Sequence, residues 1–142
     1  MNAKQLSVFI ENRQGRLGEV LGVLKENDIN IISLSLADTT EYGLLRLIVN
    51  NAEKGKKVLT EKGFSTMLTD IVIIKIENKV GGLKELLDSL AKACINVEYM
   101  YGLTIKDTNA YVVLKPSDLS KTSDILKNVG IKSLSLEEVE KW

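Results

Sequence analysis

The stretch Glu11-Asn12-Arg13-Gln14-Gly15-Arg16-Leu17 decides the fold of this 142-residue chain. An alternating apolar run before it is typical of a strand, and an apolar stripe at helical spacing follows it. A strand therefore passes into a helix through a short turn that contains Gly15. The first N–H groups of a helix have no partner inside it and carry partial positive charge. Such a turn can hold a carboxylate or a phosphate without a basic side chain.

The same stretch occurs again as Glu77-Asn78-Lys79-Val80-Gly81-Gly82-Leu83, and Asn12 and Asn78 are 78 − 12 = 66 positions apart. At this spacing Ile29-Asn30-Ile31 also recurs, as Ile95-Asn96-Val97. The repeat indicates an internal duplication. We therefore predict two domains, residues 1–69 and 70–142, each so small that it depends on packing against a neighbour.

The composition restricts the class of protein. Hydrophobic residues make up 44% of the chain and charged residues 27%, as in ordinary soluble domains. The net charge of zero argues against nucleic acid or an anionic membrane as a partner. No apolar run is long enough to cross a bilayer, and residues 1–5 lack the apolar core of a signal peptide. Cys94 is the only cysteine and allows no internal disulfide, so we expect a cytoplasmic protein.

Each half shows the order strand, helix, strand, strand, helix, strand. With right-handed crossovers, this order folds into a four-stranded antiparallel sheet with both helices on one face, the ferredoxin-like plait. The fold class is therefore α+β, with two βαββαβ units whose antiparallel sheets we expect to pack as a pair. Residue patterns place the strands at 6–11, 29–38, 44–49, 64–68, 71–77, 95–105, 111–114 and 131–134. They place the helices at 15–27, 51–62, 83–90 and 119–129, polar turns at 39–43 and 106–109, and a final helical turn after Ser135.

The motifs resemble those of the ACT domain, a regulatory family that binds amino acids or other small ligands at domain interfaces. The resemblance rests on Glu-Asn-x-x-Gly-x-Leu between strand and helix and on Ile-Asn-Ile/Val at the start of the next strand, in both halves. Segments 37–39, 42–46 and 96–101 are more particularly similar to those of stand-alone proteins made of two ACT domains. Many family members carry Asp where this chain has Asn12 and Asn78, and Pro where it has Gln14 and Val80.

The resemblance implies a ligand site at each turn. The carboxylate of an amino acid would bind the N–H groups after each glycine, and an asparagine side chain would face its α-amino group. A second asparagine, at the start of the following strand, would close the site from a neighbouring unit. The implied ligand-binding residues are Asn12, Gly15, Arg16, Leu17, Asn30 and Ile31 in the first half, and Asn78, Gly81, Gly82, Leu83, Asn96 and Val97 in the second.

An alternative interpretation makes both turns purely structural, and the residue pattern alone leaves this open. The chain would then be a protein–protein interaction module whose sheet edges pair with another protein. A catalytic role has little residue support, because the sequence contains no histidine and no nucleotide-binding or nucleophile motif. We therefore expect a regulator that is not an enzyme, needs no metal or cofactor, and forms a homodimer. It would pass the presence of an amino acid or a similar ligand to a partner enzyme or regulator.

Overall fold

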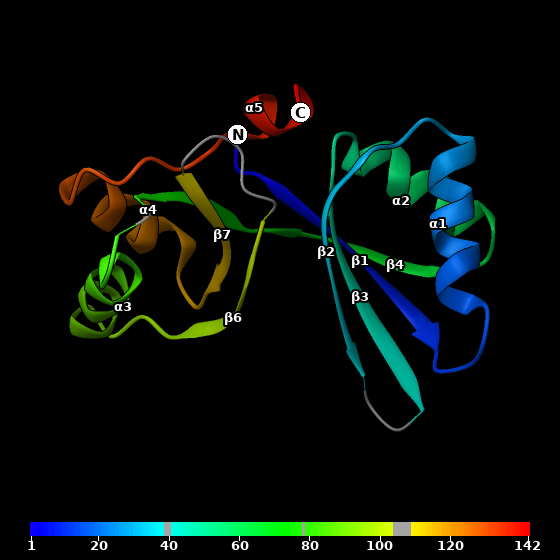
Figure 1. Cartoon of the computed structure of the whole chain (residues 1–142), viewed down its shortest axis with the longest axis horizontal. Coiled ribbons are helices and arrows are strands. Elements are labelled where there is room, and N and C mark those ends of the chain that lie inside the picture. The colour runs from blue at the N-terminus through cyan, green and yellow to red at the C-terminus, as the bar shows by residue number, and fades with distance from the viewer. Residues whose placement is uncertain (39–40, 78, 104–108) are drawn as a thin grey trace. The chain divides into compact units, whose positions relative to one another are not determined.

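A computed structural model describes residues 1–38, 41–77, 79–103 and 109–142 (Figure 1). The chain divides into two compact units, and each takes one terminal segment from the opposite end of the chain. The first unit consists of Lys4–Thr69 with Glu138–Trp142, and the second consists of Asp70–Glu137 with Met1–Ala3. The domain bounds 1–69 and 70–142 and the packing of the two sheets as a pair stay predictions.

The first unit has the predicted order of elements and one four-stranded sheet, in which the strands lie in the order β2-β3-β1-β4. β3 is antiparallel to both of its neighbours, β1 and β2. Helices α1 and α2 lie together beside this sheet in Figure 1. The bounds are β1 Lys4–Glu11, α1 Arg16–Glu26, β2 Ile31–Asp38, β3 Tyr42–Val49, α2 Ala52–Glu61 and β4 Ser65–Asp70.

Alternation along the strands produces the core of this unit. Leu6 pairs with Leu47 and Val8 with Leu45, and all four side chains are completely buried. The stripe Val20, Val23 and Leu24 of α1 packs into the same cluster. Gly55, which weakens the helix prediction for residues 51–62, lies against this core, because a Cβ atom there would be 2.9 Å from Leu6 Cδ2. Close packing therefore explains a glycine inside a helix.

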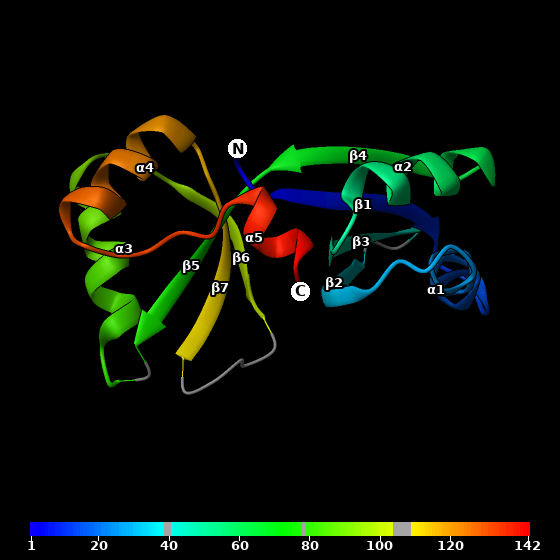
Figure 2. The same cartoon turned by 90° about the horizontal axis from the view of Figure 1, so that it is seen from above.

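The second unit repeats the arrangement with one strand fewer. Its sheet has the order β5-β7-β6, with both pairs antiparallel, and α3 and α4 lie together on one side of it (Figure 2). Val72, Ile74, Leu86, Leu90, Leu114 and Leu126 belong to the buried cluster between sheet and helices. The bounds are β5 Val72–Glu77, α3 Gly82–Lys92, β6 Val97–Gly102, β7 Asn109–Pro116, α4 Leu119–Asn128 and α5 Leu136–Glu140.

The predicted strand at 131–134 is wrong. This segment forms only an isolated bridge between Ser133 and Ile74, with two flanking hydrogen bonds to β5. The N-terminal residues bind backbone groups on either side of these contacts: Ile71 N–H donates to Ala3 O (3.1 Å) and Leu136 N–H to Met1 O (3.0 Å). The final helical turn after Ser135 is confirmed as α5. In the predicted polar turns, residues 39–40 and 106–108 lie outside the described residues.

Candidate functional site

The described residues of the two strand-to-helix turns share their backbone geometry. Gly15 and Gly81 adopt left-handed conformations with φ of 89° and 84°, and each sits at the N-cap of its helix without a side-chain cap. In the first turn Arg13 N–H donates to Glu11 O at 2.8 Å, and in the second Lys79 N–H donates to Glu77 O at 2.7 Å. Glycine is required at both positions because other residues rarely adopt this φ. The duplication therefore preserves a specific turn as well as a sequence.

The first amide of each helix already donates inside its turn, Arg16 N–H to Arg13 O and Gly82 N–H to Lys79 O, both at 3.4 Å, so the open amide groups are those that follow. Glu19 N–H donates to Gly15 O and Glu85 N–H to Gly81 O, both at 3.1 Å, so hydrogen bonding within each helix begins there. The N–H groups immediately before them have no acceptor within the helix. At α1 these include Leu17 N–H, and at α3 Leu83 N–H. Each turn is thus chemically able to receive a carboxylate oxygen.

The predicted asparagine partners lie at different places. Asn12 is exposed beside its turn, and its N–H donates to Glu41 O at 3.1 Å. Asn78 lies outside the described residues. Asn30 follows the C-terminal end of α1, so the 11 residues of this helix, roughly 16 Å at 1.5 Å per residue, separate it from Gly15. Asn96 stands in the same relation to Gly81 in the second unit.

Backbone hydrogen bonds fix both of these distant asparagines. Asn30 N–H donates to the side-chain oxygen of Asn50, whose own N–H donates to Asn30 O. Asn96 forms the same pair of bonds with Ser117. Asn30 and Ile31 also line an open hollow of about 420 Å³ at the end of α1. Within one unit these residues do not meet the turn, so their predicted role requires a neighbouring unit and stays a prediction.

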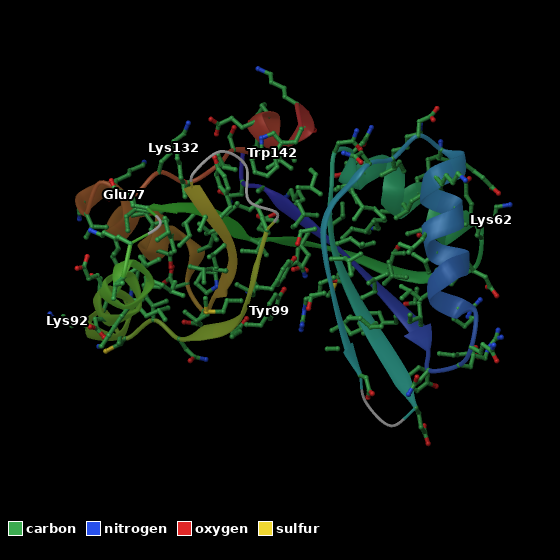
Figure 3. All side chains as sticks on the ribbon, in the orientation of Figure 1. Lys62, Glu77, Lys92, Tyr99, Lys132 and Trp142 are labelled. Atoms are coloured by element: carbon green, nitrogen blue, oxygen red, sulfur yellow. The ribbon has the colours of Figure 1, made fainter. Side chains whose placement is uncertain are left out.

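A larger cavity of about 550 Å³ lies within the second unit. It is bounded by the end of β5, one face of α3 and the segment after α4, and Glu77 and Lys132, both labelled in Figure 3, belong to its lining. Of the predicted site residues that the structure describes, which exclude Asn78, Gly82 alone belongs to this lining. The lining residues are Lys75, Ile76, Glu77, Lys79, Gly82, Glu85, Leu86, Ser89, Val129, Gly130, Ile131 and Lys132.

In the first unit an arginine occupies the position that corresponds to Gly82. The Arg16 guanidinium lies over the Phe64 ring, 4.4 Å from its centroid, and donates to the Glu19 carboxylate. Only 19% of the Arg16 side chain is exposed. The sequence already shows Gly81-Gly82 where the first turn has Gly15-Arg16, but it does not show that the Arg16 side chain packs on Phe64.

The charge of Arg13 at the first turn changes the pKa of the neighbouring Glu11 carboxylate. A hydrogen bond from Arg13 Nε to the Glu11 carboxylate (2.8 Å), together with the positive charge of Arg13, lowers the pKa of Glu11. Among the described residues no group of three or more His, Cys, Asp or Glu side chains could hold a metal ion. No helix in the described part of the chain is long and apolar enough to cross a membrane.

Comparison with known proteins agrees with the duplicated turn. A family model described as an ACT domain pair matches residues 1–138. The chain belongs to the ACT domain pair family. The crystal structure of protein BT0572 from Bacteroides thetaiotaomicron is 37% identical to this chain, with a TM-score of 0.94, over 100% of this chain and 98% of that one.

Two more distant structures share the fold of this ACT domain pair. The ligand-free regulatory subunit of aspartate kinase from Thermus thermophilus has a TM-score of 0.66 at 15% identity. The corresponding subunit from Thermus flavus has a TM-score of 0.63 at 16% identity. In both cases 92% of each chain is covered. A search of curated proteins found no match.

Proposed function

We propose that this ACT domain pair is a non-catalytic regulator that binds an amino acid at its strand-to-helix turns. The observation that carries the proposal is the repeated left-handed glycine, Gly15 and Gly81, followed in each unit by helix N–H groups that have no acceptor within the helix. A carboxylate fits these amides, and Asn12 or Asn78 would accept a hydrogen bond from the α-amino group. The ligand would lie at an interface between ACT units, with Asn30 or Asn96 supplied by the neighbour.

Binding becomes regulation only if the ligand prefers one arrangement of the units over another. A ligand bound across an interface meets this condition, because it contacts both sides only when they are correctly placed. The recipient of the signal would be a partner enzyme or regulator, in the cytoplasm.

An interaction role, including a homodimer, is supported by a different observation. β2 is an edge strand of the first sheet, and its Leu34 and Leu36 side chains are each 46% exposed. Edge strands with apolar side chains favour pairing with another chain. This role is compatible with amino-acid binding and becomes the main function if no small ligand binds.

Thermal unfolding of the full chain with each common amino acid tests the proposal. A ligand at 100 times its Kd should stabilise the protein by about 2.7 kcal/mol. Gly15→Ala and Gly81→Ala strain the turns and should reduce this stabilisation, each at a cost of about 1–2 kcal/mol in the free protein. Failure of every amino acid to raise the Tm would refute the proposal.

Gly63→Ala is the matched control. Gly63 has the same φ as Gly15, 89°, and in both places an added Cβ would have no neighbour within 4 Å. The substitution should therefore cost similar stability but leave the ligand-induced rise in Tm intact, because Gly63 follows α2 and not a strand. An equal loss of that rise in Gly63→Ala and Gly15→Ala would show that the turn itself has no special role.

A further inference from the structure

The cavity of the second unit corresponds to a filled region in the first. Helices α1 and α3 begin identically, so Arg16 and Gly82 are equivalent positions, and so are Glu19 and Glu85. Phe64 and Ile131 are equivalent because each N–H donates to a leucine carbonyl in the preceding helix, Leu59 O (3.0 Å) and Leu126 O (2.9 Å). In the first unit Arg16 lies between Phe64 and Glu19, whereas Gly82 has no side chain to place there.

The second unit keeps the carboxylate acceptor, Glu85, but has no guanidinium donor where the first unit has Arg16. Glu85 is exposed and lines the cavity, and its carboxylate forms no ion pair with another described residue. Ile76, Leu86 and Ile131 provide apolar surface that an alkyl chain could cover. Arg16 reaches Glu19 through one bond from Nη1 while its planar guanidinium lies over the Phe64 ring. An ammonium group lacks this flat face, so it cannot both cover such a surface and donate to the carboxylate in the same way. The cavity therefore lies where the first unit has the side chain of Arg16.

We propose that this cavity binds a guanidinium group on a short alkyl chain, which supplies in the second unit what Arg16 supplies in the first. The inference goes beyond amino-acid binding at the turns, because the cavity is formed by residues of one unit and its anchor is Glu85. Its volume of about 550 Å³ lies within the usual range of small-molecule sites. Lys75, Lys79 and Lys132 also line it, against Glu77 and Glu85, so the charged lining is net positive and the guanidinium group has to bind next to Glu85.

Titration of the isotopically labelled full chain with n-propylguanidinium, followed by NMR, tests the proposal. This probe reproduces the arginine side chain but has no carboxylate, so it cannot use the amides of the turns. Saturable shifts should appear at α3 and at residues 129–132, and neutral n-propylurea should bind at least about tenfold more weakly. No saturable binding of n-propylguanidinium, or equal binding of n-propylurea, would overturn the inference and leave the turn proposal untouched.

Two matched variants locate the binding. Glu85→Gln keeps the shape of the side chain and should weaken binding about tenfold or more, whereas Glu19→Gln, at the equivalent position, should leave it unchanged. Gly82→Arg should block the cavity, although its Cβ would lie 3.2 Å from Ile76 Cγ2 and need a small adjustment. Unchanged binding in Glu85→Gln would contradict the proposal even if Gly82→Arg fails to fold.

A further arm distinguishes the source of the guanidinium. Free L-arginine and N-acetyl-L-arginine amide carry the same side chain, but only the free amino acid has a carboxylate for the cavity lysines. Tighter binding of L-arginine supports a metabolite, and tighter binding of the capped form supports an arginine of a partner peptide. If neither L-arginine nor N-acetyl-L-arginine amide binds, the proposal is overturned.

Discussion

The two units of this ACT domain pair use different residues where their first strand packs against their second helix. Where the first unit places Leu6 against Gly55, the equivalent positions of the second unit hold Val72 and the completely buried Thr122. A larger strand residue thus faces a smaller helix residue in one unit, and the reverse holds in the other. The smaller strand residue Val72 thus offsets part of the volume that Thr122 adds, although this pair has six side-chain heavy atoms and the pair Leu6 and Gly55 has four.

Near the turns this compensation is absent. Arg16 and Phe64 are both replaced by smaller residues, Gly82 and Ile131, and a cavity is present in the second unit. The surrounding helix start, with its left-handed glycine and its glutamate one turn later, is unchanged. The comparison teaches that one backbone arrangement can surround two different environments. In the first unit the Arg16 side chain fills the space beside the helix, and in the second unit the same space is an open cavity.

The largest effect is expected from breaking the core compensation. Gly55→Thr brings the residue of the second unit into the first, where its Cβ would lie 2.9 Å from Leu6 Cδ2. Overpacking should lower the free energy of unfolding by roughly 2–3 kcal/mol. Urea denaturation measures this, and adding Leu6→Val should restore most of the loss. A double variant that is no more stable than Gly55→Thr would show that the two positions do not compensate.

A smaller effect is expected from opening the first unit. Arg16→Ala removes the contact with Phe64 and the ion pair with Glu19, which should cost about 1–2 kcal/mol of stability. Millimolar n-propylguanidinium should restore part of it by occupying the vacated space. Arg13→Gln is the control, because Arg13 is exposed and, within the described part of the chain, its guanidinium pairs with Glu11 and with no other carboxylate. If both variants lose the same stability, the buried contact of Arg16 contributes nothing particular.

The smallest effect concerns the charge pair at the first turn. Arg13 lowers the pKa of Glu11, so the ionised carboxylate favours the folded state. This contribution is fully present above the ordinary pKa of glutamate and is lost as pH falls through the lowered value. Arg13→Gln should raise the pKa of Glu11 in an NMR titration, and Arg16→Ala should raise it less, because Arg16 acts only through its charge. The reverse order would contradict this assignment.

Much of this architecture could be predicted from the sequence, because local chemistry determines it. The glycine turns, the alternating strands and the helix stripes each depend on residues close together in the chain. The strand predicted at 131–134 is reduced to one bridge with β5, next to contacts of Met1–Ala3 with backbone groups more than 65 positions away, which no local pattern shows. The cavity could not be predicted from any motif, because it arises from what Gly82 and Ile131 lack, and only the folded first unit shows what fills that space.

The exchange of terminal segments has a consequence for synthesis on the ribosome. Met1–Ala3 precede the first half in synthesis, yet Met1 O cannot accept its hydrogen bond until Leu136 has been added. Glu138–Trp142 follow the second half, although they belong with the first unit. Neither unit can therefore reach its final structure until the segment around residues 136–142 has been translated, and each waits for a segment on the far side of the other.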